Sequence, residues 1–87
     1  MSVKVFMDSM FDHLTGGQRE VEVEGENVSQ CLEYLWTRFP HLKSHLSDNQ
    51  GELFSDIGIF LNNDNAFPSQ PVKDGDELFI VVPIGGG

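Results

Sequence analysis

The chain has 87 residues, enough for one domain with one modest hydrophobic core. Hydrophobic residues make up 39% of it, which allows folding but leaves little to line an enzyme-sized pocket, so a binding or carrier protein is favoured over an enzyme. The formal net charge of −9 makes nucleic acid and anionic membranes poor partners, whereas it would steer a basic protein surface towards the chain. The acidity could also serve only to keep the protein in solution.

Cysteine content and hydropathy bear on where the protein works. Cys31 is the only cysteine, so no intramolecular disulfide can form and a secreted disulfide scaffold is excluded. No signal peptide is expected, because Lys4 and Asp8 interrupt the first apolar residues. No segment approaches the roughly 20 apolar residues of a membrane helix. The cytoplasm is therefore the expected location.

The first part of the chain predicts a β-hairpin. Residues 2–8 and 19–24 each alternate between apolar and other side chains, as strands with one buried face do. Residues 15–18, which include two glycines, predict a turn between them. The outward side chains of the second strand are Glu20, Glu22 and Glu24. Such a row could be a docking surface, but it is more often only a solvated face.

A helix should follow. Asn27 is a good N-cap and Gln30 stands three residues later, as in a capping box. Pro40 disfavours helical geometry at Phe39 and should end the helix there. The apolar positions between these signals form one helical stripe: Val28, Cys31, Leu32, Leu35, Trp36 and Phe39. Because Cys31 lies in this stripe, it is interpreted as a small buried hydrophobic residue and not as a nucleophile.

Two histidines in the next segment have the spacing of half a metal site. His41 and His45 lie four residues apart within residues 41–46, which predict a short helical turn. No further histidine or cysteine completes a ligand pattern, and His13 is remote in sequence. No metal site is therefore expected.

The remaining segments complete a sheet. Residues 57–61 and 77–82 alternate and predict two more strands, with polar turns at 62–65 and 73–76. Residues 66–72 contain two prolines, so they can form only a short edge strand or a loop. One helix on one face of such a sheet predicts an α+β roll.

Four short motifs resemble a known family: GENV at 25–28, RFP at 38–40, FLNN at 60–63, and KDGDEL at 73–78 leading through Pro83 into Gly85, Gly86 and Gly87. They are similar to the ThiS/MoaD-like, ubiquitin-like sulfur carriers, which include the small subunit of molybdopterin synthase and the thiazole-forming sulfur carrier. The resemblance covers nearly the whole chain. It implies one β-grasp domain over residues 1–87, with a mixed sheet of four to five strands, one main helix and a flexible tail at 83–87.

The resemblance also implies a function. An E1-like adenylating enzyme would use ATP to activate the carboxyl group of Gly87, and a sulfur source would displace AMP to leave a thiocarboxylate. The sulfur would pass to a synthase for molybdopterin, thiamin or cysteine and related thiol amino acids, and the carrier itself would bind no cofactor. Residues 14–18 look more like the carriers that serve cysteine formation. Gly85 departs from the family, which often has a larger residue there.

Terminal glycines suit this chemistry. A terminal carboxylate has a pKa of roughly 3.3–3.7, so it is ionised at neutral pH and must be activated before sulfur can attach. Without Cβ atoms, Gly85 and Gly86 could thread a narrow channel and let the backbone approach a nucleotide, while Pro83 limits flexibility behind them. The alternative interpretation is that residues 85–87 are simply a frayed terminus.

Docking requires a surface beside the tail. The strand alternation predicts that Phe6, Phe60, Phe79 and Val81 point away from the helix, as an exposed apolar patch of the kind that binds partners. Loops or a second copy could instead cover these residues.

Three functions compete. The first is the sulfur carrier, and the second is a ubiquitin-like modifier that joins Gly87 to lysines of other proteins. The third is an interaction domain with an inert tail. An independent enzyme is disfavoured, because no pairing of nucleophile, base and orienting group is visible.

Overall fold

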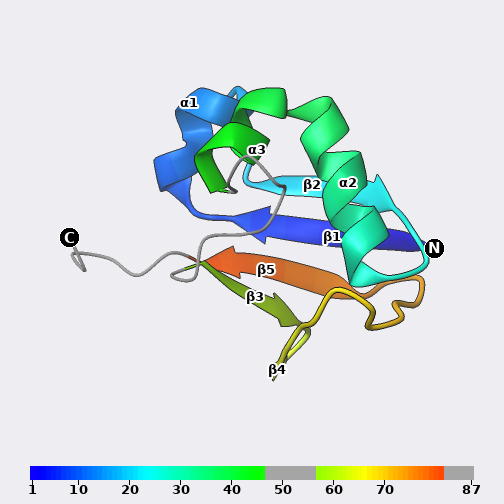
Figure 1. The fold of residues 1–87 in the computed structure, drawn as a ribbon. Helices are drawn as coiled ribbons and strands as arrows, with labels where there is room; N and C mark the ends of the chain where they lie inside the picture. Colours follow the sequence, from blue (N-terminus) through cyan, green and yellow to red (C-terminus); the bar gives the residue numbers. More distant parts are fainter. Residues whose placement is uncertain (47–56, 82–87) are drawn as a thin grey trace.

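The described residues, 1–46 and 57–81, form a sheet of five strands with helices packed on one of its faces (Figure 1). In this computed structural model the strands are β1 (Ser2–Met7), β2 (Glu20–Glu24), β3 (Gly58–Leu61), β4 (Asp64–Asn65) and β5 (Glu77–Val81). The helices are η1 (Ser9–Phe11), α1 (Asp12–Thr15), α2 (Val28–Arg38) and α3 (Pro40–Leu46). The strand order is β2-β1-β5-β3-β4, with β1 and β5 parallel and the other neighbours antiparallel. The predicted α+β fold with a mixed sheet is thus confirmed.

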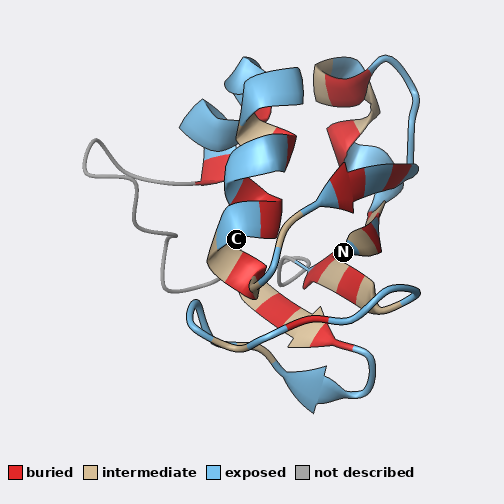
Figure 2. Ribbon diagram, turned by 90° about the vertical axis from the view of Figure 1, so that its right-hand side faces the viewer, coloured by how far each residue is buried: buried red, intermediate tan, exposed pale blue. Residues whose placement is uncertain are grey.

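The hydrophobic core lies between the helices and the facing side of the sheet. Every second residue of β1, β2 and β5 is buried there, which appears as alternating colours along the strands in Figure 2. The helix α2 adds Val28, Cys31, Leu32 and Leu35 to the same cluster. Cys31 has an exposed fraction of 0%, so its predicted place in the core is confirmed.

The start of α2 follows the predicted capping signals. The Asn27 side chain accepts a hydrogen bond from the Gln30 N–H at 2.8 Å, and the Gln30 side chain accepts one from the Glu26 N–H at 2.9 Å. Two further N–H groups of the first turn, those of Val28 and Ser29, donate to backbone carbonyls in the loop that follows β4, each at 3.0 Å. Helix termini leave such donors unpaired, so this loop serves as part of the cap.

Two segments, at 15–18 and 62–65, differ from the sequence prediction. The predicted turn at 15–18 is only the end of a longer connection, in which η1 and α1 join β1 to β2 and bury Phe11. The predicted turn at 62–65 contains the short strand β4, whereas residues 66–72 are mostly loop, with a single bridge between Asn27 and Pro71. The strand predicted at 77–82 is present as β5 up to Val81, and Val82 lies outside the described residues. In residues 1–46 and 57–81, no helix is long and apolar enough to span a membrane.

The junction between β2 and α2 is tight at Gly25. A Cβ atom placed on this residue would lie 2.8 Å from the backbone nitrogen of Cys31 and 3.0 Å from its Sγ. Real Cβ atoms do not approach backbone that closely, so either the strand end or the helix would have to move.

Gly25→Ala should therefore lower the free energy of unfolding by about 2 kcal/mol, a typical cost of overpacking. Urea denaturation followed by circular dichroism measures it. The exposed neighbour Glu24→Ala is the control and should change the value by less than about 0.5 kcal/mol. A Gly25→Ala protein as stable as the parent would contradict the close approach.

Candidate functional site

The parallel and antiparallel pairings of β5 place three phenylalanines in one row across the sheet. Phe79 on β5 is paired with Phe6 on β1 and with Phe60 on β3. The rings of Phe6 and Phe79 are stacked, with centroids 5.0 Å apart and an interplanar angle of 14°. We call Phe6, Phe60, Phe79 and Val81 the apolar patch.

The apolar patch lies on the face of the sheet that the helices leave open. The residues next to its members along β1, β3 and β5 are buried in the core, and strand side chains alternate between faces. Val81 is 44% exposed, whereas the three rings are half-buried because cross-strand neighbours cover one another. The structure thus brings the four predicted residues together on one face, and their part in docking stays a prediction.

Gly58 enlarges this face and was not predicted from the sequence. A Cβ atom on Gly58 would lie 2.9 Å from Cγ2 of Val81 and 3.3 Å from Cε2 of Phe60. Because Gly58 has no side chain, the Val81 side chain and the Phe60 ring can both lie close to the backbone of Gly58. A glycine inside a strand is the signal that could have indicated this close approach.

Acidic residues border the apolar patch. In the sheet register Glu20 stands beside Phe6, and Lys4 stands between Glu22 and Glu77. The Lys4 ammonium is 4.0 Å from a Glu20 oxygen, and both side chains are about half exposed, so this ion pair adds little stability. An apolar centre with a mostly acidic border suits a partner that has an apolar centre and a basic rim.

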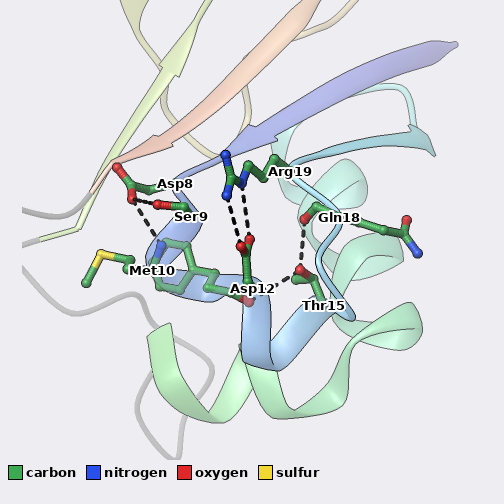
Figure 3. Close-up of polar contacts among 8 residues, drawn as sticks. Asp8, Ser9, Met10, Asp12, Thr15, Gln18 and Arg19 are labelled. Atoms are coloured by element: carbon green, nitrogen blue, oxygen red, sulfur yellow. Dashed lines mark hydrogen bonds and ion pairs between the residues drawn. The ribbon is translucent and has the colours of Figure 1, made fainter.

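The last described residue of β5 lies near the start of η1. Because β5 runs parallel to β1, its last residue, Val81, lies at the level of Asp8. The Asp8 side chain accepts a hydrogen bond from the Met10 N–H at 3.0 Å and holds η1 in place, which leaves Met10 46% exposed near this point (Figure 3). The sequence does not predict a role for Met10, because η1 is too short to show a periodic signal. The predicted tail residues Gly85, Gly86 and Gly87 lie outside the described residues.

The segment between β1 and β2 is held by a surface ion pair. Arg19 donates to Asp12 from Nη2 at 3.1 Å and from Nε at 3.3 Å (Figure 3). Asp12 raises the pKa of Arg19, mainly through these hydrogen bonds. The hydroxyl of the buried Thr15 donates to the carbonyls of Phe11 and Gln18. These contacts fix the connection and present no reactive group.

The other titratable side chains in the described part of the chain offer no catalytic constellation. The ring of His45 packs edge-on against both Phe11 and His13, each with centroids 6.2 Å apart. Within residues 1–46 and 57–81, no group of three or more His, Cys, Asp or Glu side chains could hold a metal ion. Burial raises the pKa of the Cys31 thiol, which disfavours the reactive thiolate. The described residues thus present no side-chain nucleophile poised for chemistry.

Comparison with known proteins identifies the family. Residues 10–87 match the model of the ThiS family, so the chain belongs to the ThiS family. It is 32% identical over 68 residues to small archaeal modifier protein 1 of Haloferax volcanii, which covers 77% of this chain and 78% of that protein. It is 25% identical over 93 residues to the sulfur carrier protein CysO of Mycobacterium tuberculosis, over the full length of both.

Solved structures agree with this assignment. The crystal structure of the modifier SAMP1 from Haloferax volcanii matches with a TM-score of 0.89 and 27% identity over all of both chains. A chain of the Amycolatopsis orientalis BexX/CysO complex matches with a TM-score of 0.85 and 27% identity, covering 98% of this chain and 99% of that one. The fold is therefore the β-grasp fold of ubiquitin-like sulfur carriers and modifiers, and a CysO relative forms a complex with another protein.

The ring stack of the apolar patch should contribute measurable coupling. In a double-mutant cycle of Phe6→Leu and Phe79→Leu, we expect the two changes to interact by about 1 kcal/mol in the free energy of unfolding. The cycle of Phe6→Leu with Phe60→Leu, whose strands are separated by β5, is the control and should show less than about 0.5 kcal/mol. Equal coupling in the two cycles would contradict a specific stack.

Proposed function

We propose that this protein is a sulfur carrier whose Gly87 carboxyl group is activated by an E1-like adenylating enzyme and converted to a thiocarboxylate. An oxygen of the carboxylate attacks the α-phosphorus of ATP and releases pyrophosphate, which leaves an acyl-adenylate. A hydrosulfide or protein persulfide then attacks the acyl carbon, and AMP departs. With hydrosulfide, one oxygen of Gly87 is replaced by sulfur; a protein persulfide first forms an acyl disulfide, and a thiol must then reduce it. The thiocarboxylate donates its sulfur to a synthase.

The observation that carries this proposal is the position of the apolar patch beside the end of β5. Val81 belongs to the patch and is also the last described residue, so docking on this face would bring the following residues to the partner. An extended stretch from Val81 to Gly87 spans at most about 20 Å. That length allows the body to dock on one part of a partner while the glycines enter its nucleotide site. The family match, which runs through residue 87, supports the same assignment.

The division of labour follows from the side chains. This chain supplies the carboxyl group, the glycines Gly85 and Gly86 that fit a narrow channel, and the apolar patch. The partner supplies ATP, the metal or cationic groups that neutralise phosphate, and the sulfur source. Because the described part of this chain holds no side-chain constellation for these steps, it acts as the substrate of other proteins.

A ubiquitin-like modifier is the second candidate, favoured by the 32% identity to small archaeal modifier protein 1. It would use the same activated Gly87, but a lysine amine of a target protein would attack the acyl carbon and form an isopeptide bond. Covalent adducts of higher mass in cell extract, lost with Gly87, distinguish this function from sulfur transfer alone.

Intact-mass spectrometry tests the proposed chemistry. Incubation with ATP, the adenylating enzyme from the same organism and sulfide should increase the mass by the difference between sulfur and oxygen. Deletion of Gly87 should abolish the increase, and omission of ATP should do the same. The carrier proposal fails if the mass stays constant with an adenylating enzyme that loads another carrier in the same assay.

The apolar patch can be tested separately from the tail. Phe79→Ala should weaken binding to the adenylating enzyme by about 30-fold, as loss of a central aromatic contact does. Phe67→Ala is the matched control, because Phe67 is 56% exposed but belongs to the loop after β4 and not to the apolar patch. Calorimetric titration measures both affinities, and circular dichroism verifies the fold. Equal binding of the two variants would show that docking uses another face, without bearing on Gly87.

A further inference from the structure

The strand β2 is an edge of the described sheet, and half of its backbone groups point outwards. Met7 donates its N–H to the carbonyl of Arg19 at 2.8 Å, and Gly25 donates its N–H to the carbonyl of Met1 at 3.1 Å. Hydrogen-bonded and non-bonded pairs alternate in an antiparallel ladder, so the odd-numbered residues of β2 bond to β1. The N–H and C=O groups of Glu20, Glu22 and Glu24 consequently face away from the sheet.

One side of α2 borders this edge. Nη1 of Arg38 donates to the carbonyl of Glu22 at 3.5 Å, which places that side of the helix next to the outward groups of β2. Tyr34 lies one turn earlier on the same side, since residues four apart share a helix face, and it is 41% exposed. The edge therefore has an exposed aromatic ring on its helix side. The Arg38 hydrogen bond of 3.5 Å occupies the Glu22 carbonyl, which an incoming strand would also use.

The other side of the edge is acidic. The side chains of Glu20, Glu22 and Glu24 are exposed on the face away from the helices, while Val21 and Val23 are buried beneath α2. Of the described cations, Lys4 contacts Glu20 at 4.0 Å, and the N-terminal amine lies 3.9 Å from Glu24. A second copy pairing through the same edge would bring glutamates against glutamates, and like charges on adjacent strands destabilise a sheet.

We propose that the edge of β2 binds an extended, basic segment of a partner protein as an added strand. The segment carries lysine or arginine at alternate positions, facing Glu20, Glu22 and Glu24, and apolar residues between them, one of which packs on Tyr34. Main-chain hydrogen bonds supply affinity and the alternate side chains supply selectivity, as in other strand additions. Since β2 and β1 both separate the segment from β5, the segment lies about 14 Å from the strand at the centre of the apolar patch.

Amide hydrogen exchange by NMR tests this site with a defined probe, the end-blocked peptide Lys-Val-Lys-Val-Lys-Val-Lys. With the peptide at about ten times its Kd, exchange of the Glu20, Glu22 and Glu24 amides should slow about tenfold. The amides of Val21 and Val23, already bonded to β1, should change much less. The control is the same peptide with every backbone amide N-methylated, which keeps the charge and removes every N–H that could bond to the edge of β2.

Matched variants locate the contacts. Glu22→Gln should weaken peptide binding about two- to fivefold, whereas Glu33→Gln, the same change on the exposed surface of α2, should leave it unchanged. Tyr34→Ala should also weaken it. Three results would overturn the proposal. The first is no binding at about 1 mM peptide, and the second is equal binding of the N-methylated peptide without selective protection of these amides. The third is the same protection in concentrated protein without peptide, which would make a second copy the occupant.

Discussion

The parallel pairing of β1 with β5 is the contact on which the rest of the structure depends. It joins the beginning of the chain to its last described strand, and no hairpin can create such a pair. The turn at residues 73–76 anchors it: Gly75 donates its N–H to the Ser2 carbonyl at 2.9 Å, and the Asp74 side chain accepts from the Ser2 N–H at 2.7 Å. Gly75 has a φ of 87°, which favours glycine at this position.

This anchoring gives a physical account of two motifs that mark the family resemblance. Asp76 accepts a hydrogen bond from the Lys73 N–H at 2.8 Å and one from the Asn62 side chain at 3.3 Å. Asn62 in turn accepts from the Glu77 N–H at 3.1 Å and has a φ of 56°, a conformation that asparagine tolerates well. Hydrogen bonds therefore join the FLNN segment to the KDGDEL segment. Together the two segments set the register of β3 and β5 against β1. The row of Phe6, Phe79 and Phe60 follows from that register.

The sequence predicts those parts of the fold whose signal is local. Alternation identified β1, β2, β3 and β5, and the capping signals with the apolar stripe identified α2. The segments η1, α1 and β4 escaped prediction because each is too short to show a period. Alternation also placed Phe6, Phe60, Phe79 and Val81 on one face. Their contacts depend on pairing between distant segments, so neither the ring stack nor the role of Gly58 could be derived from spacing. The open edge of β2 beside Tyr34 depends in the same way on where α2 crosses the sheet.

In the proposed function, the face of the sheet opposite the helices receives the adenylating partner. NMR chemical-shift mapping of the labelled protein with that enzyme tests it most directly. The account predicts that the largest changes among residues 1–46 and 57–81 fall on the apolar patch, Gly58 and Met10, with little change along the outer surface of α2. Changes concentrated on α2 and α3, with the apolar patch unaffected, would contradict it.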